Sequence, residues 1–266
     1  MPESARRRGT RVLLWSAMAI GLALCARTGW RLHASAELAR LSEPLQRLLA
    51  QPSLRLLIVG DSTAVGTGAS VPGASVAGLL AQRFPGLQIE NRGRDGAVFS
   101  ELMTQLEGDE RFDMVLVMAG GNDVVRLRRL AALRGDVDRV TRRARQRADL
   151  VVLMPAGNVG NAPILWAPVS WLMTWRSRQL QTFAREAAAR HGAVLVNLFC
   201  ASADDPFVLR PELNARDGLH PSDAGYRVWF GALMTQATLP QRLSAASAAG
   251  PGAPPTGATI QCATTP

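Results

Sequence analysis

The chain has 266 residues, 47% of them hydrophobic, which is enough for one globular domain with its own core and leaves room for tails. The formal net charge is +9, and every basic residue is arginine. Because the complete absence of lysine points to genome composition rather than to a functional device, we do not predict a nucleic-acid partner from this charge.

Residues 1–36 have the three parts of an export signal: an arginine-rich start, the apolar run Val12–Ala26 and the small-residue cleavage candidate Ala34-Ser35-Ala36. The apolar run is shorter than the about 20 residues that span a bilayer. A cleaved signal peptide and an uncleaved N-terminal membrane anchor therefore both stay open. In either case the positive-inside rule predicts an exported protein of the cell envelope or periplasm, anchored or secreted.

The rest of the chain divides into three predicted parts. Residues 37–50 are predicted to form a linker helix, residues 51–243 the main domain, and residues 244–266 a disordered tail rich in Ala, Gly and Pro. In the domain, apolar runs predict strands at Leu54–Val59, Leu87–Glu90, Asp113–Met118, Leu150–Met154 and Ala193–Leu198. Helical patterns lie between and after them, at Ser75–Phe84, Ser100–Leu106, Arg134–Arg147, Thr174–His191 and Pro221–Leu239. This alternation predicts a parallel sheet with helices on both faces.

Ser62 directly follows the first predicted strand, in the string Gly60-Asp61-Ser62. The carboxyl ends of parallel strands are where open α/β sheets bind ligands. A serine hydroxyl becomes a good nucleophile beside a base and an orienting carboxylate, although serine is also a common helix cap. The string does not match the G-x-S-x-G elbow of the α/β-hydrolases.

Asp217 and His220 can supply the carboxylate and the base. Of the other two histidines, His33 lies in the N-terminal region, and His191 ends a predicted helix, where a cation is favoured by the helix dipole. His220 precedes Pro221 at a junction between a loop and a helix, and Asp217 lies close enough in sequence to fix its tautomer. A turn aspartate followed by a capping histidine is the structural alternative.

Two glycine-containing segments follow the second and third predicted strands. These are Asn91-Arg92-Gly93-Arg94-Asp95-Gly96 and Gly120-Gly121-Asn122-Asp123. A glycine lets backbone N–H groups approach a ligand, and the Asn122 amide can donate a hydrogen bond. Each segment alone also suits a plain turn. Together with Ser62 and His220, they can provide all the groups that acyl transfer needs at one edge of the sheet.

The chain resembles the SGNH, or GDSL-type, hydrolases in four blocks that occur in order between about residues 54 and 226. The blocks are Gly60-Asp61-Ser62, the glycine loop after the second strand, Gly120-Gly121-Asn122-Asp123, and Asp217-Gly218-Leu219-His220-Pro221. The resemblance implies a flavodoxin-like three-layer α/β/α sandwich with a five-stranded parallel sheet. It also implies hydrolysis of an ester, thioester or O-acyl group by a serine esterase or lipase, with no metal and no cofactor.

The resemblance also implies roles for individual residues. Ser62 would be the nucleophile, His220 the general base and then acid, and Asp217 the residue that orients it. The oxyanion hole would consist of the Ser62 and Gly96 N–H groups and the Asn122 amide, with Gly93 as the alternative to Gly96. Asp61 is expected to organise its loop.

The substrate is less well defined by the sequence. We expect a small-molecule acyl ester, such as a lipid or a short to medium acyl ester, or an acylated polymer such as an O-acetylated envelope polysaccharide; a thioester is a further alternative. The segment Ile164–Trp175 carries three tryptophans and is either an acyl-binding lid, a membrane-contacting flap, or a segment packed on the body. The arginine-rich stretch Arg126–Arg147 is either a solvated helix face or a surface that attracts anionic lipid or polymer.

Two other classes of function stay open: a flavodoxin-like protein that binds phosphate or flavin through the loop after the first strand, and a catalytically silent binding module of the envelope. The first would leave Asn122, Asp217 and His220 without a role. Cys200 and Cys262 can pair in an oxidising compartment. The oligomeric state stays open.

Overall fold

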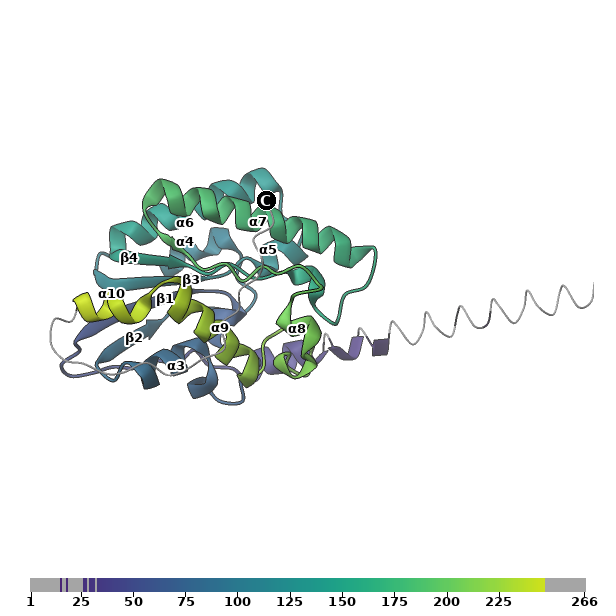
Figure 1. Cartoon of the computed structure of the whole chain (residues 1–266), viewed down its shortest axis with the longest axis horizontal. Coiled ribbons are helices and arrows are strands. Elements are labelled where there is room, and N and C mark those ends of the chain that lie inside the picture. The colour runs from purple at the N-terminus through teal and green to yellow at the C-terminus, as the bar shows by residue number, and fades with distance from the viewer. Residues whose placement is uncertain (1–14, 16–17, 19–25, 28, 32, 247–266) are drawn as a thin grey trace, which may run out of the picture.

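The structure is a computed structural model that describes residues 15, 18, 26–27, 29–31 and 33–246. Its centre is a five-stranded parallel sheet with the strand order β2-β1-β3-β4-β5, covered by helices on both faces (Figure 1). The strands are β1 (Leu54–Gly60), β2 (Leu87–Asn91), β3 (Phe112–Met118), β4 (Ala148–Leu153) and β5 (Val194–Leu195). The predicted three-layer α/β/α fold is confirmed.

Each face of the sheet has its own apolar core, because successive strand residues point to opposite faces. Leu57 and Val115 pack on one face against α4 (Leu102–Gln105), α6 (Leu130–Arg147) and α7 (Val169–His191). On the other face, Leu56 and Met114 pack against α3 (Val76–Arg83), α9 (Asp223–Gln236) and α10 (Leu239–Ala246). Burial on both faces explains why the strands read as nearly continuous apolar runs.

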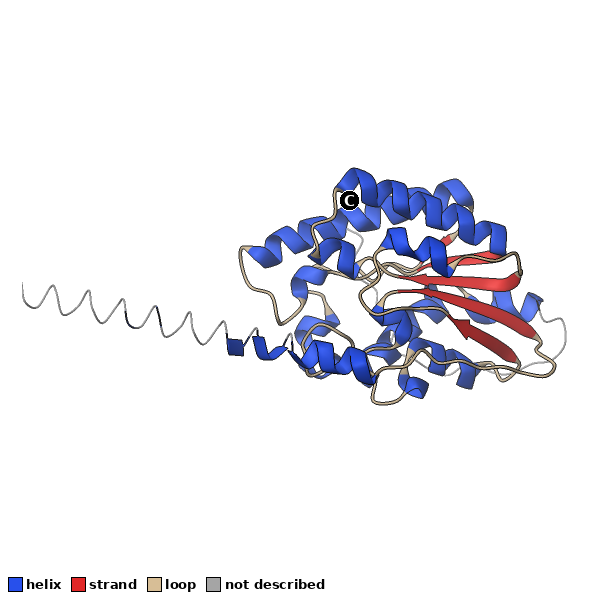
Figure 2. Cartoon of the chain, turned by 180° about the vertical axis from the view of Figure 1, so that it is seen from behind, coloured by secondary structure: helices blue, strands red, loops and turns tan. Residues whose placement is uncertain are grey.

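The carboxyl ends of the strands, where the polar loops begin, lie at one end of the molecule. Figure 2 shows that the first turns of α7 and the N-terminal helix, which includes residues 33–41, extend from this same end. The sheet order reverses between β1 and β3, which is the place where open α/β sheets form a ligand-binding crevice. The segments after β1, β2 and β3 therefore border one crevice, as the sequence predicted.

The predicted linker helix over residues 37–50 is wrong in its second half. The helix ends at residue 41, and residues 42–50 are not helical. Pro44 explains the end, because proline lacks an N–H group and disfavours helical geometry in the residue before it. Beyond it, Arg47 forms an isolated antiparallel bridge with Ile89, through two backbone hydrogen bonds of 2.9 Å, and so covers the free edge of β2.

Three further element boundaries differ from the predictions. The predicted helix Pro221–Leu239 is two helices, α9 and α10, separated at Thr238, which has a positive φ of 46°. Since α10 continues to Ala246, the first three residues of the predicted tail are helical, and residues 247–266 lie outside the described residues. The last strand is shorter than predicted, with only Val194 and Leu195 paired to β4.

Several one-turn helices were not predicted, because a single turn is too short to show a periodic pattern. They are α2 (Ser62–Val65), α5 (Gly121–Val125) and α8 (Pro206–Leu209), with 3₁₀ turns at Pro72–Ala74, Val159–Asn161 and Pro211–Leu213. The predicted helix Ser100–Leu106 is a 3₁₀ turn at Phe99–Glu101 followed by α4.

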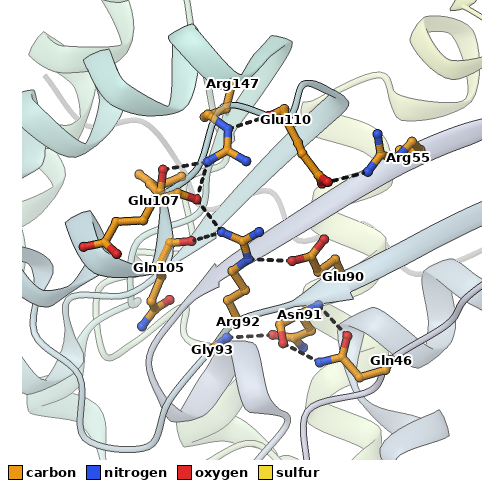
Figure 3. Close-up of polar contacts among 11 residues, drawn as sticks. Gln46, Arg55, Glu90, Asn91, Arg92, Gly93, Gln105, Glu107, Glu110 and Arg147 are labelled. Atoms are coloured by element: carbon orange, nitrogen blue, oxygen red, sulfur yellow. Dashed lines mark hydrogen bonds and ion pairs between the residues drawn. The ribbon is translucent and has the colours of Figure 1, made fainter.

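Several arginines of the stretch Arg126–Arg147 have partners within the domain. Arg147 is buried and donates hydrogen bonds of 2.6–2.7 Å to the carbonyl groups of Leu106, Glu107 and Glu110 (Figure 3). Arg92 from the second loop reaches the same Glu107 carbonyl and pairs with Glu90. These arginines thus bind the chain between α4 and β3, where several carbonyl groups lack a helix or strand partner.

Ion pairs occupy several of the other arginines of this stretch. Arg128 and Arg139 both pair with the buried Asp136, and Arg134 pairs with Glu186 of α7. Arg126, Arg129 and Arg142 are exposed, as the interpretation of the stretch as a solvated face expects.

Most of the predicted signal or anchor segment lies outside the described residues, as do Cys25 and Cys262. In the part of the chain that is described, no helix is both long and apolar enough to cross a membrane. Cys200 is buried and disulfide-bonded.

Candidate active site

The turn after β1 places Ser62 at the carboxyl edge of the sheet. Gly60 has a positive φ of 156°, and a Cβ atom there would overlap the Met118 carbonyl oxygen, so the close approach of β1 to β3 requires glycine. Asp61 then caps α2: its carboxylate accepts hydrogen bonds from the Thr63 N–H group at 2.9 Å and the Thr63 hydroxyl at 2.8 Å. Ser62 is the first residue of α2, so its N–H group is one of those that have no partner within the helix.

His220 reaches Ser62 across the crevice, although the two residues are 158 positions apart in the sequence. Its Nε2 atom lies 2.8 Å from the Ser62 Oγ, and its Nδ1 atom lies 2.6 Å from Asp217 Oδ2. The side chains are nearly enclosed, with 9% of Ser62, 7% of His220 and none of Asp217 exposed. The three residues predicted as nucleophile, base and orienting acid therefore form one hydrogen-bonded chain.

Asp217 is held as a carboxylate despite its burial. Burial alone would raise the pKa of this group, but hydrogen bonds and the charge of His220 hold the pKa below its ordinary value. The donors are the His220 ring and the N–H groups of Leu219 and His220, both to Oδ1 at 3.0 and 3.1 Å. A carboxylate fixed in this way keeps the imidazole proton on Nδ1 and leaves Nε2 free to accept the serine proton.

Asn122 and Gly96 lie in the same cavity as Ser62 and His220. Asn122 is in the first turn of α5, where a plain turn was the alternative, and one of its amide hydrogens is donated to the Ala97 carbonyl at 3.2 Å. A side-chain amide has a second hydrogen to donate. Gly96 has a left-handed φ of 75°, which favours glycine, and borders the cavity directly before Ala97.

Of the two glycines considered for the oxyanion hole, the structure places only Gly96 on the cavity wall. Gly93 is buried against Ala64, and its N–H group donates to Asn91 Oδ1 at 3.0 Å. Its backbone donor is therefore used within the loop and is not directed to the nucleophile.

Asp123 is a residue of the site to which the sequence analysis gave no role. It is fully buried, and its Oδ2 accepts the Phe99 N–H group at 3.0 Å, which connects α5 to the loop that carries Gly96. Burial raises its pKa to about 6, against the opposing effects of this hydrogen bond and of Arg128, whose Nε lies 3.7 Å away. The one signal in the sequence that could have identified Asp123 is its position directly after Asn122, as the last residue of the segment Gly120–Asp123.

The cavity above Ser62 has a volume of about 470 Å³, within the range of small-molecule sites. One part of its wall is polar, with Asn158, Asn161, Asp205 and Asn214, and Phe207 and Trp229 add an aromatic part. Burial raises the pKa of Asp205, whose carboxylate accepts a hydrogen bond from Asn161 at 2.6 Å. Among the described residues there is no group of three or more His, Cys, Asp or Glu side chains that could hold a metal ion.

The tryptophan-rich segment Ile164–Trp175 does not cover the nucleophile. Trp166, Trp171 and Trp175 are 54%, 71% and 48% exposed, and none of the three is among the described residues that line the cavity. This arrangement argues against an acyl-binding lid.

Comparison with solved structures identifies several proteins of the same fold. LAE5, an alpha/beta hydrolase enzyme from the metagenome of Lake Arreo, is 24% identical with a TM-score of 0.54, and the match covers 70% of this chain and 96% of that protein. Axe2, an acetylxylan esterase from Geobacillus stearothermophilus, is 24% identical with a TM-score of 0.50 and coverages of 71% and 96%. A member of the lipolytic protein G-D-S-L family from Veillonella parvula is 15% identical, with a TM-score of 0.56 and coverages of 69% and 98%.

No match is found among curated protein sequences. A family model, described as the GDSL-like lipase/acylhydrolase family, matches residues 58–228. The match begins within β1 and ends within α9, so it includes all four predicted blocks and the Ser62–His220–Asp217 chain. The protein belongs to the GDSL-like lipase/acylhydrolase family.

Proposed function

We propose that the protein is a serine esterase that hydrolyses a carboxylic ester through an acyl-enzyme formed on Ser62. The observation that carries the proposal is the hydrogen-bonded chain from Ser62 Oγ through His220 to Asp217, with distances of 2.8 and 2.6 Å. These hydrogen-bonded side chains lie at a cavity that Gly96 and Asn122 also line. Membership of the lipase/acylhydrolase family supports ester hydrolysis as the reaction.

The first half-reaction forms a bond between Ser62 Oγ and the carbonyl carbon. His220 Nε2 removes the hydroxyl proton as the oxygen attacks, and the Asp217 carboxylate stabilises the imidazolium that results. The negative charge that develops on the carbonyl oxygen is stabilised by the N–H groups of Ser62 and Gly96 and by the Asn122 amide. When the tetrahedral intermediate collapses, His220 gives its proton to the leaving alcohol, and the acyl group stays on Ser62.

The second half-reaction repeats these steps with water in place of the alcohol. His220 deprotonates the water, which attacks the acyl carbon, and the same donors stabilise the second oxyanion. His220 then returns the proton to Ser62 Oγ as the carboxylic acid leaves. The enzyme is restored without a net change in its protonation.

The dimensions of the cavity favour a small ester, such as a lipid ester or a short to medium acyl ester. A second candidate is an acetyl ester of an envelope polysaccharide. It is favoured by the polar wall of Asn158, Asn161 and Asp205, which offers hydrogen-bonding groups to a hydroxylated alcohol. The structural neighbour Axe2 is an acetylxylan esterase. A thioester would be cleaved by the same steps.

The proposed place of action is the cell envelope or the periplasm. This rests on the arginine-rich start and the apolar run Val12–Ala26, through which the N-terminal segment would associate with the membrane. The exposed Trp166 and Trp171 are amphipathic side chains of the kind that is enriched at membrane surfaces. Fractionation of cells tests this: recovery of the protein in the cytoplasmic fraction would contradict it.

The function is tested by replacing Ser62 with alanine. Ser62→Ala should lose measurable turnover of 4-nitrophenyl acetate and should no longer be labelled by a fluorophosphonate probe, because the attacking oxygen is absent. Ser53→Ala is the matched control, since Ser53 is exposed and precedes β1 at the opposite edge of the sheet. A parent protein that neither hydrolyses esters nor reacts with the probe would instead support a catalytically silent binding module.

A further inference from the structure

The helix that includes residues 33–41 contributes to the wall of the cavity above Ser62. Ser35, Ala36 and Ala39 line the same cavity as Ser62 and His220, and Ala34 is buried. Ser35 and Ala39 are four residues apart and therefore share a face of the helix. The division of the chain that the sequence predicted, with a removable segment ending at residue 36, would pass through this wall.

Two contacts fix this helix to the segment that carries the catalytic carboxylate. Glu37 pairs with Arg216 at 2.9 Å, immediately before Asp217. Arg31 lies against Gly218, immediately after Asp217, at a place where any side chain at residue 218 would overlap the guanidinium group. The helix thus touches both neighbours of Asp217.

The Arg31 contact depends on packing more than on hydrogen bonding. Its Nη1 atom is buried and has no hydrogen-bond partner among the described residues. Burial lowers the pKa of Arg31, and the nearby Asp217 charge acts in the opposite direction. The positive φ of 67° at Gly218 leaves glycine as the residue that fits there, with no Cβ atom between the arginine and the loop.

The chemistry of the proposed reaction defines which part of the ester lies near this helix. The carbonyl oxygen must face Gly96 and Asn122, and the leaving oxygen must face His220 Nε2, which protonates it. The helix is fixed to the loop that positions His220. The part of the cavity wall that this helix forms therefore lies next to the alcohol of the ester rather than next to its acyl group.

We propose that the helix of residues 33–41 forms the wall of the leaving-group pocket, and that the small side chains of Ser35, Ala36 and Ala39 set the largest alcohol that the enzyme accepts. The proposal rests on the proposed function of Ser62. It also requires that the working enzyme is not cleaved at Ala34-Ser35-Ala36, because cleavage there would remove Arg31 and part of the wall.

The experiment introduces bulk into the wall of the full-length protein and varies the alcohol of the substrate. Ala36→Phe is compared with Leu41→Phe, because Leu41 is exposed on the same helix and does not line the cavity. The substrates are ethyl, 4-nitrophenyl and 4-methylumbelliferyl acetate, with 4-nitrophenyl butyrate and hexanoate as an acyl series. Since each substrate is compared with itself in the parent, differences in leaving-group reactivity cancel.

Ala36→Phe should lower the ratio of kcat/KM for the aryl acetates to that for ethyl acetate by at least about tenfold. Each methylene-sized part of the alcohol that loses its contact reduces kcat/KM about fourfold, equivalent to about 0.8 kcal/mol. The profile across the acyl series should keep its shape, and Leu41→Phe should match the parent. Ala39→Leu, a smaller change, should give a weaker shift in the same direction if Ala36→Phe unfolds.

Three results would overturn the proposal: a uniform loss on all esters, a shift along the acyl series in place of the alcohol series, or an equal effect of Leu41→Phe. N-terminal sequencing of active protein provides an independent check, because a chain that begins at Glu37 with unchanged selectivity would also overturn it. Failure of the proposed function is distinguishable, since a parent that hydrolyses none of these esters, or an active Ser62→Ala, refutes that function first.

Discussion

Replacing Asp217 by asparagine is the sharpest test of how the hydrogen-bonded chain works. The variant keeps the size of the side chain, and its amide oxygen can still accept the N–H groups of Leu219 and His220 that now bind Oδ1. The amide nitrogen would then face His220 Nδ1 in place of Oδ2. Because that nitrogen is a donor, it favours the tautomer with the proton on Nε2, which cannot accept the proton of Ser62.

The expected loss is large because Asp217 is fully buried and water cannot replace it. In the serine-protease triad, the same change of carboxylate to amide lowers kcat about 10⁴-fold by trapping the wrong tautomer, which corresponds to about 5.4 kcal/mol of transition-state stabilisation. We expect a loss of this order here, with little change in KM. The measurement is the initial rate of 4-nitrophenyl acetate hydrolysis across a range of substrate concentrations.

The control is Asp149→Asn, since the Asp149 side chain is 90% exposed and lies in β4 away from the cavity. Thermal unfolding of both variants separates loss of activity from loss of fold. The carboxylate of Asp217 has a lowered pKa, so it stabilises the fold above its unfolded-state pKa, and this stabilisation is lost as the pH falls through the folded-state pKa. If folded Asp217→Asn keeps more than about one tenth of the parent kcat, the tautomer argument is refuted.

The remaining predictions concern the loops opposite His220. Asn122→Ala should lower kcat by about 10²–10³ with a nearly unchanged KM, because one oxyanion donor is lost, and steady-state kinetics that show a rise in KM alone would contradict this role. Asp123→Asn should remove a pH dependence of stability. The raised pKa of about 6 means that the folded protein binds this proton more tightly than the unfolded chain, so the parent should lose up to about 3 kcal/mol relative to the variant as the pH rises from about 4 to about 7. Denaturant unfolding at both pH values measures the difference, and parallel pH profiles for parent and variant would exclude Asp123 as its source.

Local patterns in the sequence were sufficient for the layered fold and for the three residues of the hydrogen-bonded chain. Buried parallel strands and long amphipathic helices have periodic patterns that depend on their own residues. The five strands and the long helices were therefore found in the correct order, although several of their ends differ and the last predicted helix is two helices. The residues that lie together at the site could also be predicted from the sequence, because the carboxyl ends of parallel strands meet at one edge of the sheet. Four polar segments placed after strands or before the last long helix therefore had to lie near one another.

Contacts between distant segments could not be predicted from the sequence in the same way. No pattern in residues 42–50 indicates that Arg47 pairs with the edge of β2. The sequence around Arg147 does not show whether its side chain is buried or solvated, because its partners are carbonyl groups between α4 and β3 that only the fold brings to it. The role of Asp123 similarly depends on Phe99, which the fold brings to it from another loop.

The sequence by itself determined the fold class, the order of its elements and the choice of Ser62, His220 and Asp217 as the proposed nucleophile, base and acid, because these depend on periodicity and on the chemistry of side chains at strand ends. Only the tertiary structure decided that Gly96 rather than Gly93 borders the cavity, and that Ser35, Ala36 and Ala39 of the N-terminal helix line it. Both depend on which surfaces remain uncovered after the layers pack. Packing is a property of the whole chain, and no short segment of the sequence records it.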